Sequence, residues 1–155
     1  MKKLFKRWQQ TTVKNALKIW RVVVISGPRQ SGKTTLAQHV GGKRDAFITL
    51  DDPLMLNAAL DDPMGFVRHE QGTLIIDEIQ KAPSLLLAIK RTVDSDNRKG
   101  QFLLTGSADI RTLPTITDSL AGRISHVNLR TLANGEILGK QPKRANWSRL
   151  WFSTN

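Results

Sequence analysis

The sequence predicts an α/β domain in which helices cover both faces of a five-stranded parallel sheet. Short aliphatic runs alternate along the chain with segments of helical periodicity, which is typical of such sheets. The first of these runs leads into a glycine-rich loop and then a helix. A chain of 155 residues has the length of one domain and can bury a substantial core.

The expected elements follow from the periodicity of the apolar residues. Strands are expected at residues 21–26, 46–50, 73–78, 101–105 and 125–129. Helices are expected at residues 2–20, 35–40, 54–60, 64–70, 83–94 and 114–121. Gly41-Gly42 can end the second helix, and Pro63 and Pro83 suit the first turns of later ones.

The glycine-rich loop fits the pattern G-x-x-x-x-G-K-[ST] and lies between a strand and a helix, as that pattern requires. Its backbone N–H groups and the helix N-terminus can hold a polyphosphate. Lys33 would reach the β- and γ-phosphates, and the Thr34 hydroxyl would ligate Mg²⁺. The fold class is therefore a P-loop NTPase sandwich of three layers. The expected nucleotide-binding residues are Gly27, Pro28, Arg29, Gln30, Ser31, Gly32, Lys33, Thr34 and Thr35.

Two acids end the strand at residues 73–78. Because ligands bind at the carboxyl ends of parallel strands, Asp77 is expected beside the phosphate loop, where it would hold the Mg²⁺ shell with Thr34. Glu78 would face the γ-phosphate and deprotonate the attacking water. Two solvated acids before a turn would look the same, but the loop upstream favours the functional interpretation.

The strand at 101–105 also ends in hydroxyl groups. A polar side chain here could hydrogen-bond the attacking water or the γ-phosphate. Thr105 is the first choice for this role and Ser107 the alternative. A Ser/Gly turn after a strand is a common feature, so a purely structural role for both residues stays open.

The charge is distributed unevenly along the chain. Residues 1–44 hold 11 Lys/Arg and no acid, residues 137–155 hold 4 and no acid, and residues 45–136 hold 9 basic and 13 acidic residues, which gives the net +11. Basic ends can bind nucleic acid or an anionic membrane surface, or they can form a solvated helix face, and these interpretations stay open.

Composition and the N-terminus bear on the compartment. There is no cysteine and no apolar run near the ~20 residues of a membrane span. The basic N-terminus has no apolar stretch after it, so we expect no secretory signal and a cytoplasmic protein.

The motifs, in order and spacing, resemble the ATPase domain of the AAA superfamily, in particular a prokaryotic group in which a C-terminal domain of unknown function follows. The resemblance covers roughly residues 18–138. The strings that carry it are GPRQSGKTTL, LDDP, LIIDEIQKAP, VD, QFLLTGS, SLAGRI and Gly135-Glu136.

The resemblance implies roles for individual residues. Lys33 and Thr34 match the phosphate and Mg²⁺ positions, and Asp77 and Glu78 match the Mg²⁺-coordinating acid and the catalytic base. Arg123 resembles the arginine that reaches a neighbouring subunit's γ-phosphate, which implies a homo-oligomer. A surface arginine at a helix end is the alternative for Arg123.

Members of this group usually continue far beyond the core, with a helical lid, and we expect this chain to be truncated after it. The expected organisation is a basic helix at 1–20, the ATPase core at 21–136 and a basic, poorly ordered tail at 137–155. The expected function is binding and hydrolysis of ATP with Mg²⁺. The alternatives are a nucleotide-binding remnant with little turnover and an ATP-switched module that binds nucleic acid. Arg29 could contact phosphate or pair with Asp51.

Overall fold

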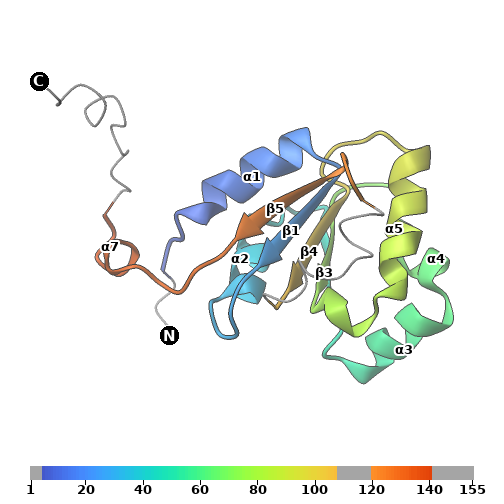
Figure 1. Cartoon of the computed structure of the whole chain (residues 1–155), viewed down its shortest axis with the longest axis horizontal. Coiled ribbons are helices and arrows are strands. Elements are labelled where there is room, and N and C mark those ends of the chain that lie inside the picture. Colours follow the sequence, from blue (N-terminus) through green and yellow to red (C-terminus); the bar gives the residue numbers. More distant parts are fainter. Residues whose placement is uncertain (1–4, 108–119, 141–155) are drawn as a thin grey trace, which may run out of the picture.

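The computed structural model describes residues 5–107 and 120–140, and it confirms the α/β fold (Figure 1). Five strands form one parallel sheet in the order β2-β3-β4-β1-β5. The strands are β1 (Val22–Ser26), β2 (Ala46–Thr49), β3 (Leu74–Asp77), β4 (Phe102–Gly106) and β5 (Ile124–Asn128).

The strand register decides where the expected site residues meet. β1 lies between β4 and β5, with Ser26 opposite Gly106 and Asn128. β3 pairs with β2 so that Asp77 lies opposite Thr49. Because all strands run the same way, their carboxyl ends share one edge of the sheet. The loop after β1 therefore lies at the same edge as the ends of β3 and β4.

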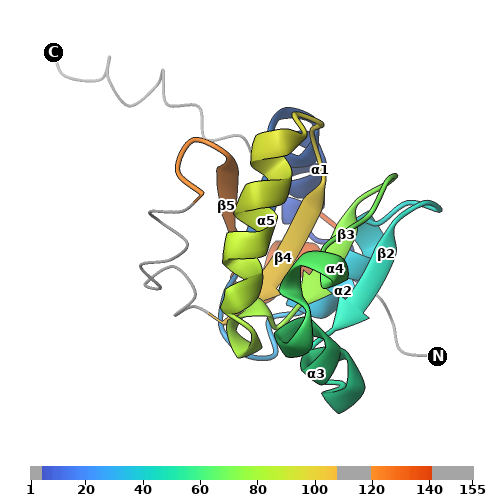
Figure 2. The ribbon, with the colours of Figure 1, turned by 90° about the vertical axis from the view of Figure 1, so that its right-hand side faces the viewer.

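Helices cover both faces of the sheet. One face is packed by α1 (Gln9–Ile19) and α2 (Lys33–Val40), and the other by α3 (Pro53–Asp61), α4 (Pro63–Phe66) and α5 (Ser84–Ser95) (Figure 2). A 3₁₀ turn, η1 (Ile79–Lys81), follows β3, and the short helix α7 (Asn134–Ile137) follows β5. No helix of the described ranges combines the length and the apolar character that crossing a membrane requires.

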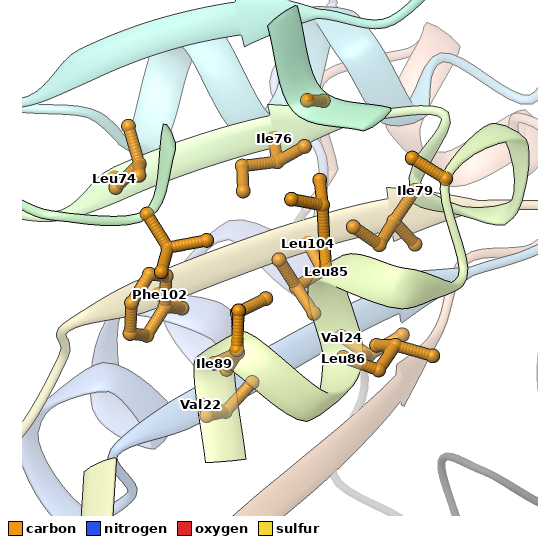
Figure 3. Packing of buried hydrophobic residues seen from close by; sticks show 14 of the residues in the cluster. Val22, Val24, Leu74, Ile76, Ile79, Leu85, Leu86, Ile89, Phe102 and Leu104 are labelled. Carbon is orange, nitrogen blue, oxygen red and sulfur yellow. The ribbon is translucent and has the colours of Figure 1, made fainter. Parts of the chain in front are cut away.

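The alternating side chains of β1 divide the core into two clusters. Val22 and Val24 belong to the cluster under α5, whereas Val23 and Ile25 belong to the cluster under α1 and α2. Figure 3 shows the first cluster, in which side chains of α5 lie against those of the strands. Full burial of such side chains contributes about 1.5–3 kcal/mol each. The three central strands β1, β3 and β4 are buried on both faces, which explains why they are largely apolar.

Three expectations about helices need correction or lie outside the described residues. The first helix begins at Gln9, later than its periodicity predicts, because the preceding residues make tertiary contacts with α7. α4 ends at Phe66, since Val67 is buried and the His69 ring packs edge-on against Phe102. Most of the helix expected at 114–121, and residues 141–155 of the tail, lie outside the described residues.

Candidate functional site

The phosphate loop connects the end of β1 to α2, and two of its glycines are required by geometry. A Cβ on Gly27 would lie 2.2 Å from the carbonyl oxygen of Leu129, so the loop passes close to the chain that leaves β5. Gly32 has φ 87°, a left-handed conformation that glycine adopts without strain, and it precedes the first residue of α2. These glycines hold the loop at the end of the sheet.

Lys33 is folded over the loop. Its Nζ donates hydrogen bonds to the carbonyls of Gly27 (3.1 Å) and Pro28 (2.9 Å), and the residue is only 6% exposed. A buried ammonium group needs polar partners, and these two carbonyls supply them. The cation is thus held inside the curve of the loop.

Asp77 is the centre of a polar cluster formed by four elements. The hydroxyl of Thr34, in α2, lies 3.1 Å from Oδ1 and 3.0 Å from Oδ2 of Asp77. Thr105, in β4, donates a short hydrogen bond to Oδ1, and Thr49, in β2, lies 3.5 Å from Oδ2. Asp77 is 3% exposed and Thr105 fully buried. The structure therefore brings together three residues that the sequence assigns to the site: Thr34, Asp77 and Thr105.

The donor set at Asp77 fits Mg²⁺ held jointly by protein and substrate. A hydroxyl and a carboxylate are hard oxygen donors, as Mg²⁺ prefers. In the described part of the chain, no group of three or more His, Cys, Asp or Glu residues could hold a metal alone. Mg²⁺ usually binds one or two protein ligands together with substrate phosphates and waters. Thr34 and Asp77 match that pattern beside a phosphate loop.

Glu78 follows β3 at the carboxyl edge of the sheet and is half-buried. Its backbone N–H donates to the Thr105 hydroxyl (3.3 Å), and its carboxylate accepts a short hydrogen bond from Gln80. Thr105 thus contacts both acids of the site, which indicates that it positions them. Gln80, on the turn after β3, orients the carboxylate.

Two residues of the described chain other than glycine have positive φ, and both belong to the site. Gln30 has φ 61° in the phosphate loop, and Glu78 has φ 59° after β3. Such conformations are strained and persist where the surrounding structure fixes them, often at functional sites. Neither conformation is visible in the sequence.

A cavity of about 560 Å³ adjoins the outer side of the loop. It lies between the segment before α1 and the first turns of α2. Its lining includes Phe5, Gln10, Gly32, Thr35, His39 and Leu132. Its volume and its mixture of apolar and polar side chains suit a small organic ligand. Thr35, expected to bind nucleotide, lies on its wall.

Arg123, which the sequence also assigns to the site, lies apart from this cluster. Arg123 precedes β5, and its carbonyl accepts from the N–H of Val22, so it lies at the opposite edge of the sheet. Its guanidinium pairs with Asp94 and donates to the Ala121 carbonyl (3.0 Å). Ser107 follows β4 and is half-buried.

Arg29 is exposed at the tip of the loop. Asp51 pairs with Lys81 (2.6 Å), so the Arg29–Asp51 ion pair does not form in this structure. A phosphate contact by Arg29 stays a prediction.

The sequence predicts no role for two further residues beside the phosphate loop, Arg7 and Glu136. The Arg7 guanidinium donates to the carbonyls of Ser31 (2.5 Å) and Arg130 (2.6 Å) and to Glu136 Oε1 (3.1 Å). Burial raises the pKa of Glu136, but hydrogen bonds from the N–H groups of Ala133 and Trp8 and from Arg7 outweigh it and hold that pKa below its ordinary value. In the sequence, Arg7 is one of several basic residues near the N-terminus, and nothing distinguishes it from the others. The only sequence signal for Glu136 is the Gly135-Glu136 string.

Comparison with known proteins identifies the family. A family model described as an AAA domain matches residues 20–138. The chain belongs to this AAA family. Uncharacterised proteins of Mycobacterium tuberculosis and Mycobacterium bovis are each 37% identical to it over 117 residues, which cover 75% of this chain and 26% of theirs. The AAA chain thus spans about a quarter of the length of these relatives.

Solved structures share the fold of this AAA domain. DnaA of Aquifex aeolicus bound to AMPPCP has a TM-score of 0.59 at 17% identity, and the match covers 99% of this chain and 59% of DnaA. The Pif1 helicase of Bacteroides has a TM-score of 0.54 at 17% identity, and the match covers 83% of this chain and 42% of the helicase. At 17% identity these matches show a shared fold.

Proposed function

We propose that this AAA domain binds ATP with Mg²⁺ and hydrolyses it. The observation that carries the proposal is the contact between the Thr34 hydroxyl and both carboxylate oxygens of Asp77, beside a loop that encloses Lys33. A phosphate loop alone would support binding of any polyphosphate. A hydroxyl and a carboxylate at its end add the two protein ligands of a substrate-bound Mg²⁺.

Each residue has a distinct task in the proposed reaction. Lys33 leaves the carbonyls of Gly27 and Pro28 and binds the β- and γ-phosphates, whose charge it stabilises. Mg²⁺, when bound, would neutralise developing charge between the same phosphates. Glu78 orients and deprotonates the water that attacks the γ-phosphorus in line with the leaving oxygen. The products are ADP and phosphate.

The cavity beside the loop is the proposed site of the nucleoside. Gly32 and Thr35, which adjoin the expected position of the phosphates, line one part of it. Other parts of its wall are formed by Leu36, His39 and Leu132. The nucleoside proposal is independent of the metal site. The DnaA neighbour was solved with AMPPCP, a triphosphate analogue, which supports a triphosphate here.

The direct test is a phosphate-release assay on the purified chain with ATP, in Mg²⁺ and in EDTA. The proposal expects turnover that needs Mg²⁺. Tight Mg-ATP binding with turnover at background would favour the nucleotide-binding remnant, and absence of both would overturn the proposal. The same assay with GTP tests whether the domain prefers adenine or guanine nucleotides.

We propose a second function, contact with nucleic acid, on the basis of the charge distribution. Lys14 and Lys18 are exposed on α1, while Val13 and Ala16 on the same helix are buried in the core. A Pif1 structure similar in fold holds single-stranded DNA. Because α1 packs in the core, the test replaces its exposed lysines, Lys14 and Lys18, and keeps the helix. The measured quantity is the salt dependence of DNA binding. Each lost phosphate contact should lower the salt slope of binding by about 0.9 on duplex DNA. No retention on DNA at low salt would exclude this function.

A further inference from the structure

Arg7 links the phosphate loop to the C-terminal helix of the described chain. Although arginine is usually exposed, this one is 8% exposed. Its guanidinium bonds to the Ser31 carbonyl in the loop, the Arg130 carbonyl after β5 and the Glu136 carboxylate in α7. The planar guanidinium carries five donors on three nitrogens and so reaches three partners in different directions, whereas the three donors of a lysine share one nitrogen. The loop, the chain after β5 and α7 therefore meet at one side chain.

The contact with Ser31 fixes the direction of a backbone donor. The carbonyl of Ser31 and the N–H of Gly32 belong to one planar trans peptide, so they point in opposite directions. Arg7 Nη1 donates to that carbonyl at 2.5 Å. The Gly32 N–H then points away from Arg7. Backbone N–H groups directed into a P-loop are what bind the phosphates.

The loop needs such external support. Its conformation includes Gln30, a residue with a side chain, at φ 61°. Left-handed conformations persist when neighbouring structure fixes them. A Cβ at Gly32 would lie 3.3 Å from Arg7 Nη1, so the guanidinium packs directly on this peptide. Arg7 is placed to stabilise the conformation that binds phosphate.

Glu136 holds Arg7 in turn. Its carboxylate accepts from Arg7 Nε, from the Trp8 N–H (2.8 Å) and from the Ala133 N–H (2.9 Å). The Trp8 ring lies so close to Gly135 that a Cβ there would be 2.6 Å from it, and its Nε1 donates to the Lys140 carbonyl (2.9 Å). The contacts that dock α7 are therefore the same contacts that hold Arg7 in place.

We propose that Arg7 is a positioning residue for the phosphate loop, held by Glu136, and that it couples polyphosphate binding to the docking of α7. The proposal rests on the function proposed above, and it adds a residue pair outside the P-loop and Asp77-Glu78 motifs. Whatever undocks α7 releases Arg7 and weakens the grip of the loop on phosphate. Phosphate in the loop, by the same linkage, favours docked α7.

The test uses Mg-tripolyphosphate, which has no nucleoside, because Arg7 also lines the adjoining cavity. Calorimetric titration compares the wild-type chain with Arg7→Met, Arg7→Lys and Glu136→Gln. Lys43→Met is the matched control, since Lys43 is exposed, does not line this cavity and carries the same charge. We expect Arg7→Met to lose affinity by about tenfold to a hundredfold, the range of a charge-assisted hydrogen bond. Glu136→Gln should lose less, and Lys43→Met should stay near wild type.

The amide resonance of Gly32 in ligand-free protein supplies a second readout, which general destabilisation would not move. It should shift in folded Arg7→Met and, to a smaller extent, in Glu136→Gln. Arg7→Lys should bind tripolyphosphate with intermediate affinity. If Arg7→Met does not fold, Arg7→Lys replaces it in both measurements. Wild-type affinity together with an unshifted Gly32 amide in folded Arg7 variants would overturn the proposal. An equal loss of affinity in Lys43→Met would also overturn it. If the wild-type chain binds neither tripolyphosphate nor ATP, the proposed function fails, whereas the Gly32 shift still tests Arg7.

Discussion

The hydroxyl of Thr34 lies 3.0 Å and 3.1 Å from the two carboxylate oxygens of Asp77, although the residues are 43 positions apart in the chain. Thr34 is in the first turn of α2 and Asp77 is the last residue of β3. The parallel sheet causes this meeting, because it brings the ends of β1 and β3 to one edge. The pair is the proposed protein share of the Mg²⁺ shell.

Replacing Thr34 by Ala should remove the effect of Mg²⁺ on ATP affinity. The reason is that the hydroxyl belongs to one of the two protein residues proposed to bind the ion, and Ala supplies no oxygen. ATP titrations with Mg²⁺ and with EDTA should differ in the wild-type chain and agree in the variant. Thr12→Ala, an exposed threonine on α1, is the control. A variant that keeps the full Mg²⁺ effect would remove Thr34 from the metal site.

Glu78→Gln should keep ATP affinity and lose hydrolysis, because the amide preserves the shape and cannot accept a proton. General-base catalysis contributes on the order of 10²–10⁴-fold. Single-turnover phosphate release measures the loss without interference from product release. Glu70→Gln, at an exposed glutamate, should hydrolyse ATP like wild type. Unchanged turnover in Glu78→Gln would exclude Glu78 as the base.

The sequence predicts the sheet and three members of the Asp77 cluster, Thr34, Asp77 and Thr105, because each follows from a pattern local to a strand or a loop. Thr49, the fourth member, is marked by no such pattern. Buried parallel strands read as aliphatic runs, and the phosphate loop has fixed spacing. The start of the first helix and the end of α4 could not be predicted, since contacts made by Arg7 and His69 override helical propensity there. The role of Arg7 depends on Glu136, which is 129 residues away, and no local pattern encodes such a contact.

Stability should depend on pH through Glu136. Its pKa in the folded chain lies below the ordinary value of 4.5, so it stabilises the fold above that pH and the contribution disappears as pH falls through the folded pKa. Urea unfolding at pH 6 and pH 4 should show a smaller loss on acidification in Glu136→Gln than in wild type. Removing a partner of a buried pair costs about 3–5 kcal/mol, so the variant should also be less stable at pH 6. An equal loss of unfolding free energy between pH 6 and pH 4 in both chains would show that the protonation of Glu136 is not coupled to unfolding.

Arg123→Ala tests the predicted assembly. If Arg123 completes a neighbour's site, the variant should bind ATP normally and hydrolyse it slowly. Mixing it with Glu78→Gln should restore part of the activity, because some interfaces then join an intact Arg123 to an intact Glu78. Asp94→Asn is the control, since it breaks the pair with Arg123 and leaves the guanidinium in place. A strictly monomeric chain in sedimentation with ATP would contradict this prediction.

The most direct test of the account is calorimetric titration of the Lys33→Ala chain with Mg-ATP. Lys33 is the buried cation inside the loop, and it would exchange two carbonyls for phosphate oxygens. Circular dichroism establishes that the variant is folded, and Lys43→Ala removes an exposed lysine beyond α2 as the matched control. We predict wild-type affinity in Lys43→Ala and a loss of at least about tenfold in Lys33→Ala, as for a lost charge-assisted hydrogen bond. Undiminished affinity in a folded Lys33→Ala chain would contradict the assignment of this loop as the ATP site.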